Sequence, residues 1–283
     1  MPLRLLTWNL YHGRDFPPDP GLFTPRSRIL RVSERNATHV QVNRYLLREF
    51  SEVLCGAAWD IALLQESPPR WGEPLAAHCA SEAHGVLTSR NTLGRLRSFL
   101  ARINPDLIGA NEGGSNLTLV RGAAGTIVER RALVLRPGPV PERRMMAFTV
   151  AELADGEAIC ISNLHASAGR PLAALAEEEV LAAAERSVEW AAGRPLVLGG
   201  DLNLRPAQSG VYELLAERFS LAGPTAPNSL DHLLVRGLTV EMAPTPWPPQ
   251  RRELQRDGFA LRLSDHAPVE SVFEFSAAPP ARG

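Results

Sequence analysis

The chain has 283 residues, of which 45% are hydrophobic and 22% charged, values typical of a globular protein with a sizeable core. Its formal net charge is −1, so no bulk basic character favours nucleic-acid binding, although a local arginine patch would suffice for it. All 30 cationic side chains are arginine, which excludes Schiff-base and P-loop lysine chemistry.

Short apolar strands and amphipathic helices alternate at the start of the chain. We expect a strand over residues 3–8, a helix around 46–54, a strand over 60–64 and a helix around 93–103. Four consecutive strands follow, over 116–121, 125–135, 146–153 and 158–164. A helix over 173–188 comes next, and then strands over 196–199, 230–235 and 269–275. Hairpins mixed with helices predict an α+β fold, with one domain over 1–275 and a flexible tail over 276–283.

The number and spacing of the cysteines and the lengths of the apolar runs indicate the cellular compartment. Cys55, Cys79 and Cys160 are an odd number without CxxC spacing, so neither a disulfide framework nor a zinc finger is expected. No charged-then-apolar leader precedes the first strand, and no apolar run reaches the roughly 18 residues that span a bilayer. We expect a cytoplasmic monomer that does not insert into membranes.

Polar residues stand where several of these strands end. Asn9 follows the first strand, Glu66 follows the second, and His165 ends the strand over 158–164. A carboxylate in such a place can hold a hard cation through oxygen. Each residue also has a structural interpretation: a strand-end Asn commonly forms a turn, and a lone His is more often packed than catalytic.

The most specific cluster is Asp201-Leu202-Asn203, which follows Gly199-Gly200. Paired glycines allow a sharp turn where a ligand approaches the backbone closely. Asp201 and Asn203 are two residues apart and point the same way in an extended segment, which suits a pair that orients water or phosphate. An Asx turn is the alternative.

Two acid–imidazole neighbours complete the set. Asp231 lies in an apolar strand, where a carboxylate is costly unless it is paired, and His266 is its candidate partner. Asp265 and His266 precede the final strand, and such a pair can serve metal-assisted hydrolysis, with one group on a cation and the other moving a proton. A solvated loop is the simpler interpretation of this triplet alone.

In this order, the clusters Thr7-Trp8-Asn9, Gln65-Glu66, Asn163-Leu164-His165, Gly199-Gly200-Asp201-Leu202-Asn203, Leu230-Asp231-His232 and Ser264-Asp265-His266 resemble the endonuclease/exonuclease/phosphatase superfamily, the DNase I-like enzymes. The resemblance implies a four-layer α/β-sandwich of two packed mixed β-sheets flanked by helices. It also implies a Mg²⁺-dependent phosphoesterase, with Mn²⁺ as an alternative cofactor.

The resemblance assigns a role to each matching residue. Glu66 would be the main metal ligand, with Asn9 beside it and Asp265 in or next to the metal shell. His266, held by Asp231, would act as the general base. Asp201 and Asn203 would orient the water, the phosphate or the leaving oxygen, and His165 would bind the phosphoryl oxygens. Asn116 and Arg121 are candidate substrate contacts, and His12, Gly13 and Arg14 form either a turn or part of the same rim.

Departures from related patterns bear on the substrate. His165 stands where abasic-site endonucleases lack a histidine, and their tryptophan-rich loop before Asp231 is missing. The Pro-x-Trp-Cys-Asp-Arg signature of 5-phosphatases is also absent. Gly114 falls where deoxyribonucleases carry a Glu that partners the site histidine, with Glu112 nearby. We therefore expect a phosphodiester substrate, most readily nucleic acid. The alternatives are a phosphomonoesterase, a lipid- or inositol-headgroup phosphodiesterase, or a catalytically silent binding module.

Overall fold

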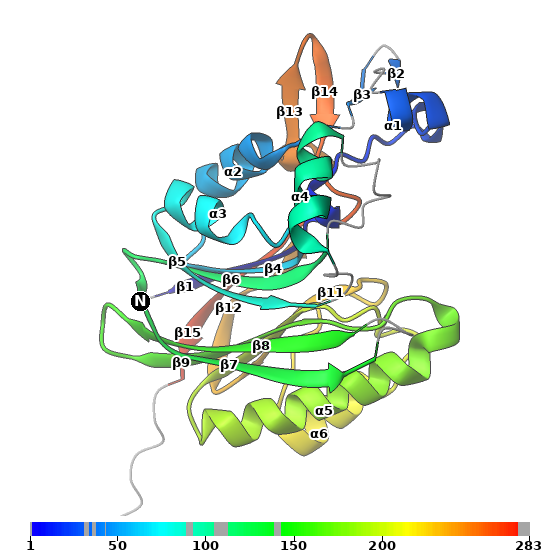
Figure 1. The fold of residues 1–283 in the computed structure, drawn as a ribbon. Coiled ribbons are helices and arrows are strands. Elements are labelled where there is room, and N and C mark those ends of the chain that lie inside the picture. Colours follow the sequence, from blue (N-terminus) through cyan, green and yellow to red (C-terminus); the bar gives the residue numbers. More distant parts are fainter. Residues whose placement is uncertain are drawn as a thin grey trace, which may run out of the picture.

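Two β-sheets pack face to face and carry helices on their outer faces (Figure 1). The computed structural model describes residues 2–30, 34–35, 38–42, 44–88, 93–104, 113–138 and 143–276. Of the predicted tail over 276–283, only Ser276 belongs to this described part.

The first sheet has six strands in the order β12-β15-β1-β4-β6-β5. It is mixed, because β1 runs parallel to β4 and antiparallel to β15. Its strands are β1 (Leu3–Asn9), β4 (Ile61–Ser67), β5 (Ser81–Leu87), β6 (Ser115–Arg121), β12 (Leu238–Pro246) and β15 (Val269–Phe275).

The second sheet has five strands in the order β11-β10-β9-β8-β7. It is also mixed, with β9 and β10 parallel and the other neighbours antiparallel. Its strands are β7 (Gly125–Arg136), β8 (Arg144–Leu153), β9 (Ala158–His165), β10 (Leu196–Asp201) and β11 (Asp231–Arg236).

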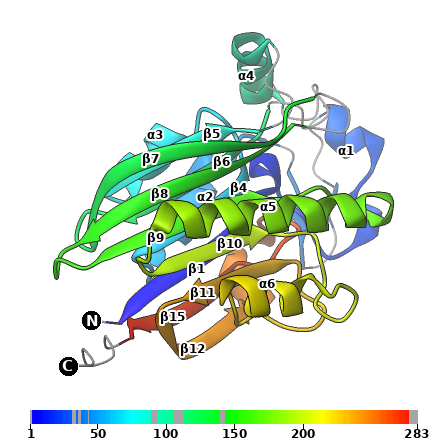
Figure 2. The ribbon, with the colours of Figure 1, turned by 90° about the horizontal axis from the view of Figure 1, so that it is seen from below.

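Helices cover the outer face of each sheet, which makes four layers (Figures 1 and 2). On the first sheet, α2 (Leu47–Gly56) and α3 (Gly72–His78) bury a cluster around Trp8, Phe50 and Trp71. On the second, α5 (Ala173–Ala191) and α6 (Val211–Phe219) cover a separate cluster that includes Phe148 and Val180. The predicted α+β fold, a four-layer sandwich of two mixed sheets, is confirmed.

Smaller elements lie around this core. They are α1 (Pro25–Leu30), α4 (Gly94–Ile103), the paired strands β2 (Glu34–Arg35) and β3 (Val40–Gln41), and the hairpin of β13 (Glu253–Arg256) and β14 (Phe259–Arg262). Short 3-10 helices are η1 (Tyr11–Gly13), η2 (Pro20–Leu22), η4 (Arg170–Leu172) and η5 (Pro249–Arg252). Within the described residues, no helix has the length and apolar character needed to cross a bilayer.

The faces that the sheets turn toward each other change from apolar to polar along the strands. Because side chains alternate across a strand, Leu3, Leu5, Thr7 and Asn9 of β1 share one face. Leu3 and Leu5 belong to the apolar cluster between the sheets, whereas Thr7 and Asn9 are buried polar residues. The same change occurs along β4, β9 and β10, as Leu63 gives way to Gln65, Ile161 to Asn163, and Val197 to Asp201. The strand ends therefore bring polar side chains of both sheets into one buried region.

Hydrogen bonds join the two sheets in this polar region. The Gln65 amide donates to Asn163 Oδ1 at 2.8 Å and to Thr7 Oγ1 at 3.1 Å. The Asn163 amide in turn donates to Leu117 O at 3.1 Å. Buried polar groups are costly unless paired, so this network fixes how the sheets are aligned beside the site.

The structure also contains elements that the sequence pattern did not predict. These are α3, α6, β5, β12 and the β13–β14 hairpin. The helix expected around 93–103 is present as α4, but most of its large apolar side chains are not buried. Leu93, Leu96, Phe99 and Ile103 are all exposed.

Candidate functional site

The pair His266 and Asp231 forms the centre of the site. Asp231 is the first residue of β11, and its Oδ2 lies 2.7 Å from Nδ1 of His266, which sits in the loop before β15. The other ring nitrogen, Nε2, lies 3.7 Å from Oδ2 of Asp201 at the end of β10. One carboxylate thus orients the imidazole through Nδ1, as in a general base, and the second nitrogen faces the carboxylate of Asp201.

Asp201 is fixed by neighbours from both sheets. Asn9 Nδ2, at the end of β1, donates to Asp201 Oδ2 at 2.9 Å, and the backbone N–H of Asn203 donates to Oδ1 at 3.1 Å. Asn203 has a positive φ of 54°, and its side-chain amide donates to Ala166 O at 3.1 Å. Asp201 and Asn203 therefore form the Asx-type turn and also lie at the predicted site, where Asn203 is half-buried.

The electrostatics of this cluster follow from burial and crowded carboxylates. Burial raises the pKa of Asp201 to about 7, and the charges of Asp231 and Glu66 act in the same direction. Burial opposes a charged His266, but Asp231 and Asp201 outweigh it and raise the pKa of His266 to about 10. Without a cation, the cluster therefore retains protons at neutral pH.

Glu66 faces the cluster from the end of β4 in a strained conformation. Its φ is +48°, in the left-handed region, and the ladder between β4 and β6 is irregular between Leu64 and Ser67. Glu66 Oε1 lies 3.8 Å from His165 Nε2, and Oε2 lies 3.3 Å from Nε2 of His12. His12 thus belongs to the rim of the site.

His165, the last residue of β9, is buried and neutral. Its Nε2 is 3.6 Å from Asp201 Oδ2, but burial and the positive charge of Arg144 lower its pKa well below the usual value. His165 can therefore donate an N–H but does not bring a positive charge. The nearby cation is Arg144, which is buried at the start of β8. The sequence did not predict its role, because its only signal there is the pair Arg143-Arg144 before a strand.

The loop that carries Asp265 and His266 is tied to the end of β1. Ser264 is buried with a φ of +58°, and its Oγ donates to Asn9 O at 2.6 Å and accepts the N–H of His266 at 3.0 Å. Trp8 Nε1 donates to His266 O at 3.1 Å. Asp265 itself is exposed at the rim, within electrostatic range of Glu66. Ser264 thus positions the neighbouring imidazole, a role that the Ser-Asp-His triplet did not reveal.

The two predicted substrate contacts lie near opposite ends of β6. Asn116 is buried on β6, where its amide donates to Met145 O at 2.8 Å. Arg121 is at the opposite end of the same strand, where its guanidinium donates to carbonyl oxygens including Ala57 O at 2.9 Å and stacks on Trp59 with 4.2 Å to the ring centroid. The structure gives Arg121 a packing role away from the site, so we do not include it in the proposed chemistry. Glu112 lies outside the described residues.

The donor set suits a divalent cation. Glu66, Asp201, Asp231 and Asp265 concentrate negative charge on one site, and Oδ1 of Asp231 is buried without a hydrogen-bond partner among the described residues. One ligand atom each from Asp201, Asp231 and His266 also lies within 4.8 Å of the others. Carboxylate and amide oxygens are the ligands preferred by Mg²⁺.

Solved structures share this fold. A search of curated proteins found no match. An endonuclease/exonuclease/phosphatase family protein from Bacteroides thetaiotaomicron has a TM-score of 0.67 at 15% identity, covering 98% of this chain and 99% of that chain. A mannosyl-6-phosphatase from the same organism has a TM-score of 0.63 at 17% identity, covering 96% and 100%. The human Nocturnin catalytic domain with bound sulfate has a TM-score of 0.63 at 16% identity, covering 97% and 94%.

The sequence itself matches a family model over nearly its whole length. The model describes the Endonuclease/Exonuclease/phosphatase family and covers residues 6–266, the span that contains every cluster of the site. Members of this family are hydrolases acting on phosphoester bonds and generally use a divalent metal. This chain belongs to the endonuclease/exonuclease/phosphatase family.

Proposed function

We propose that this protein is a Mg²⁺-dependent phosphodiesterase that acts on nucleic acid. The observation that carries the proposal is the imidazole of His266, fixed at 2.7 Å to Asp231 and facing the buried carboxylate of Asp201 at 3.7 Å. Hydrolysis of a phosphoester needs an oriented water, a group that takes its proton, and neutralisation of the phosphoryl oxygens. The residues around His266 offer each of these.

In this proposal, His266 takes the proton of the attacking water, and Asp231 holds the ring and stabilises the imidazolium that forms. Asp201, fixed by Asn9, and Asn203 orient the water or the leaving oxygen. His165 donates its N–H to a phosphoryl oxygen, and buried Arg144 supplies positive charge nearby. Asp231 and Asp201 raise the pKa of His266, and a cation held by the neighbouring carboxylates would lower it.

Glu66 would hold the cation, with Asn9 and Asp265 beside it. When bound, a divalent cation polarises the phosphoryl oxygens and balances the charge that develops on them. The Asp231–His266 contact of 2.7 Å is the length of a charge-assisted hydrogen bond, so we assign that pair to proton transfer rather than to metal binding. The strained φ of Glu66 is consistent with a side chain held for function.

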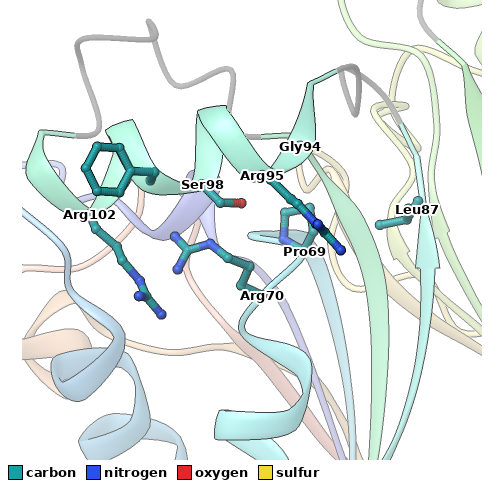
Figure 3. Close-up of a pocket in the computed structure, with 8 residues that line it drawn as sticks. Pro69, Arg70, Leu87, Gly94, Arg95, Ser98 and Arg102 are labelled. Atoms are coloured by element: carbon teal, nitrogen blue, oxygen red, sulfur yellow. The ribbon is translucent and has the colours of Figure 1, made fainter.

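Two pockets with arginine in their walls offer space for parts of a substrate beyond the reacting phosphate. One pocket, of about 420 Å³, is lined by residues that include Arg70, Arg95, Phe99 and Arg102 (Figure 3). The other, of about 360 Å³, is lined by residues that include Asn203 and Arg205. A diester carries a group on each side of phosphorus, whereas a monoester carries only one. A guanidinium group can donate two parallel hydrogen bonds to the oxygens of a phosphate, and an exposed aromatic ring can stack on a base.

A phosphomonoesterase is the second candidate. The specific observation in its favour is the similarity in fold to a mannosyl-6-phosphatase, at 17% identity. The metal and proton-transfer machinery proposed above would serve either ester, so substrate choice depends on the walls of the site rather than on His266.

The test is a substrate panel: bis(p-nitrophenyl) phosphate, p-nitrophenyl phosphate and plasmid DNA, each with Mg²⁺ and with EDTA. Cleavage of the diester and of DNA, abolished by EDTA, is the expected result. Hydrolysis of the monoester alone would overturn the diester proposal in favour of a phosphatase. Turnover that survives EDTA would contradict the metal dependence.

A further inference from the structure

We propose that His12 is a nitrogen ligand of the same divalent cation, so that the centre, besides holding Mg²⁺, binds Mn²⁺ more tightly than an all-oxygen centre would. This inference deepens the proposed function and rests on the metal centre at Glu66. The proposed mechanism assigns no role to His12. Yet its Nε2 lies 3.3 Å from Glu66 Oε2, and its side chain is only 12% exposed.

The second ring nitrogen of His12 indicates which atom faces Glu66. Nδ1 lies 3.1 Å from the carbonyl oxygen of Gly113. A carbonyl oxygen only accepts hydrogen bonds, so Nδ1 carries the hydrogen, and a neutral ring then presents the lone pair of Nε2 to the Glu66 carboxylate. Two electron-rich atoms repel unless a cation lies between them. Histidines that bind metals commonly donate their other N–H to a backbone carbonyl in this way.

The spacing of the two atoms fits a shared cation. Neighbouring ligands at right angles on a cation, each with a bond of about 2.1 Å, lie about 3 Å apart. The distance of 3.3 Å between Nε2 and Oε2 needs only a small adjustment to meet this geometry. The other interpretation is a protonated His12 that forms a direct ion pair with Glu66.

The backbone holds His12 in this place at a conformational cost. Tyr11, His12 and Gly13 have consecutive positive φ values of 49°, 53° and 74°. The turn is anchored by the Tyr11 N–H, which donates to Asn9 Oδ1 at 2.9 Å, and by Gly13, where a Cβ atom would overlap the ring of Trp71. Left-handed conformations are unfavourable for non-glycine residues and cluster at functional sites.

An imidazole ligand raises the affinity for Mn²⁺ relative to that for Mg²⁺. Mg²⁺ selects oxygen ligands, whereas imidazole suits transition metals, whose affinities rise from Mn²⁺ toward Cu²⁺. A centre with Glu66 Oε2 and His12 Nε2 on one cation therefore has a mixed oxygen and nitrogen set. Removal of the imidazole is expected to weaken Mn²⁺ binding more than Mg²⁺ binding.

The test is titration calorimetry of the full chain, stripped with EDTA and desalted, against Mn²⁺ and Mg²⁺ separately. We expect His12→Ala to weaken Mn²⁺ binding about 10-fold or more and Mg²⁺ binding much less. His39→Ala is the matched control, because His39 pairs with Glu253 at 3.2 Å, away from the proposed ligands. Thermal unfolding of the metal-free variants checks that each one folds.

Pulsed EPR of bound Mn²⁺ supplies a second readout, since a coordinated imidazole gives ¹⁴N coupling that His12→Ala should reduce. Unchanged or tighter Mn²⁺ binding by His12→Ala would overturn the inference, because loss of a cationic His12 would relieve repulsion instead. If Glu66→Gln abolishes Mn²⁺ binding in that case, the proposed metal centre stands and only the His12 ligand fails. Absence of binding by the wild type would overturn both.

Discussion

Gly200→Ala tests why two glycines precede Asp201. Gly200 has a φ of +131° and pairs with Leu164 across the parallel strands β9 and β10. A Cβ atom at this position would overlap the carbonyl oxygen of Leu164 and would lie 3.1 Å from Gln65 Nε2. Both neighbours are fixed, one in a strand ladder and the other in the network between the sheets. The added methyl group therefore has no space without a shift of the strands that place Asp201.

The magnitude of the effect follows from these two terms. The φ value costs an L-residue about 1–3 kcal/mol. Overpacking of a tight interior costs about 1–3 kcal/mol more. We therefore expect Gly200→Ala to lower the free energy of unfolding by about 2–6 kcal/mol, a large part of the stability of an ordinary domain.

Gly223→Ala is the matched control, because Gly223 also has a positive φ, +88°, but a Cβ atom there would meet nothing within 4 Å. Only the backbone term applies, so a loss of about 1–2 kcal/mol is expected. Urea unfolding followed by tryptophan fluorescence measures both variants. Equal losses in the two would refute the argument that close approach of β9 explains Gly200.

Three further predictions concern the site and its surroundings. Asp231→Asn removes the charge that holds His266, so turnover of a diester should fall about 10²–10⁴-fold with little change in KM, and a loss of only about threefold would contradict the pairing. Burial lowers the pKa of His84 from 6.5 to about 4, so the protein should lose up to about 3 kcal/mol of stability as the pH falls through that interval. Urea titrations at several pH values should show that His84→Gln removes this pH-dependent loss. A difference in stability between the variant and the wild type that does not change with pH would contradict the prediction. Arg121→Ala should cost about 2–4 kcal/mol of stability without raising KM, whereas a higher KM at unchanged stability would restore its role as a substrate contact.

Much of the fold was readable from the sequence because its strands are apolar and end in polar residues. Leu3, Leu5, Ile161 and Val197 are buried between the sheets, and their periodicity predicts strands directly. β5 is not predicted from the sequence, because Glu82, His84 and Gly85 interrupt the run of apolar residues. α6 is not predicted either, although Val211, Leu215 and Phe219 repeat at four-residue spacing and are buried.

The sequence predicts those site residues whose chemistry requires a partner. A carboxylate at Asp231 needed an imidazole, and the structure places it against His266, 35 residues away. Arg144 and Ser264 were not predicted, because their roles depend on neighbours that only the folded sheets bring together. The place of Arg121 could not be predicted for the same reason, because strand periodicity does not show which end of β6 faces the site.

The most direct test of the central claim is the rate of Mg²⁺-dependent hydrolysis of bis(p-nitrophenyl) phosphate by wild type, His266→Ala and His39→Ala. If His266 moves the proton, its removal should lower turnover about 10²–10⁴-fold in a protein that still folds, as shown by a cooperative unfolding transition. His39→Ala should keep the wild-type rate, since that side chain pairs with Glu253 away from the site. Turnover by His266→Ala equal to that of the wild type would contradict the assignment of the base.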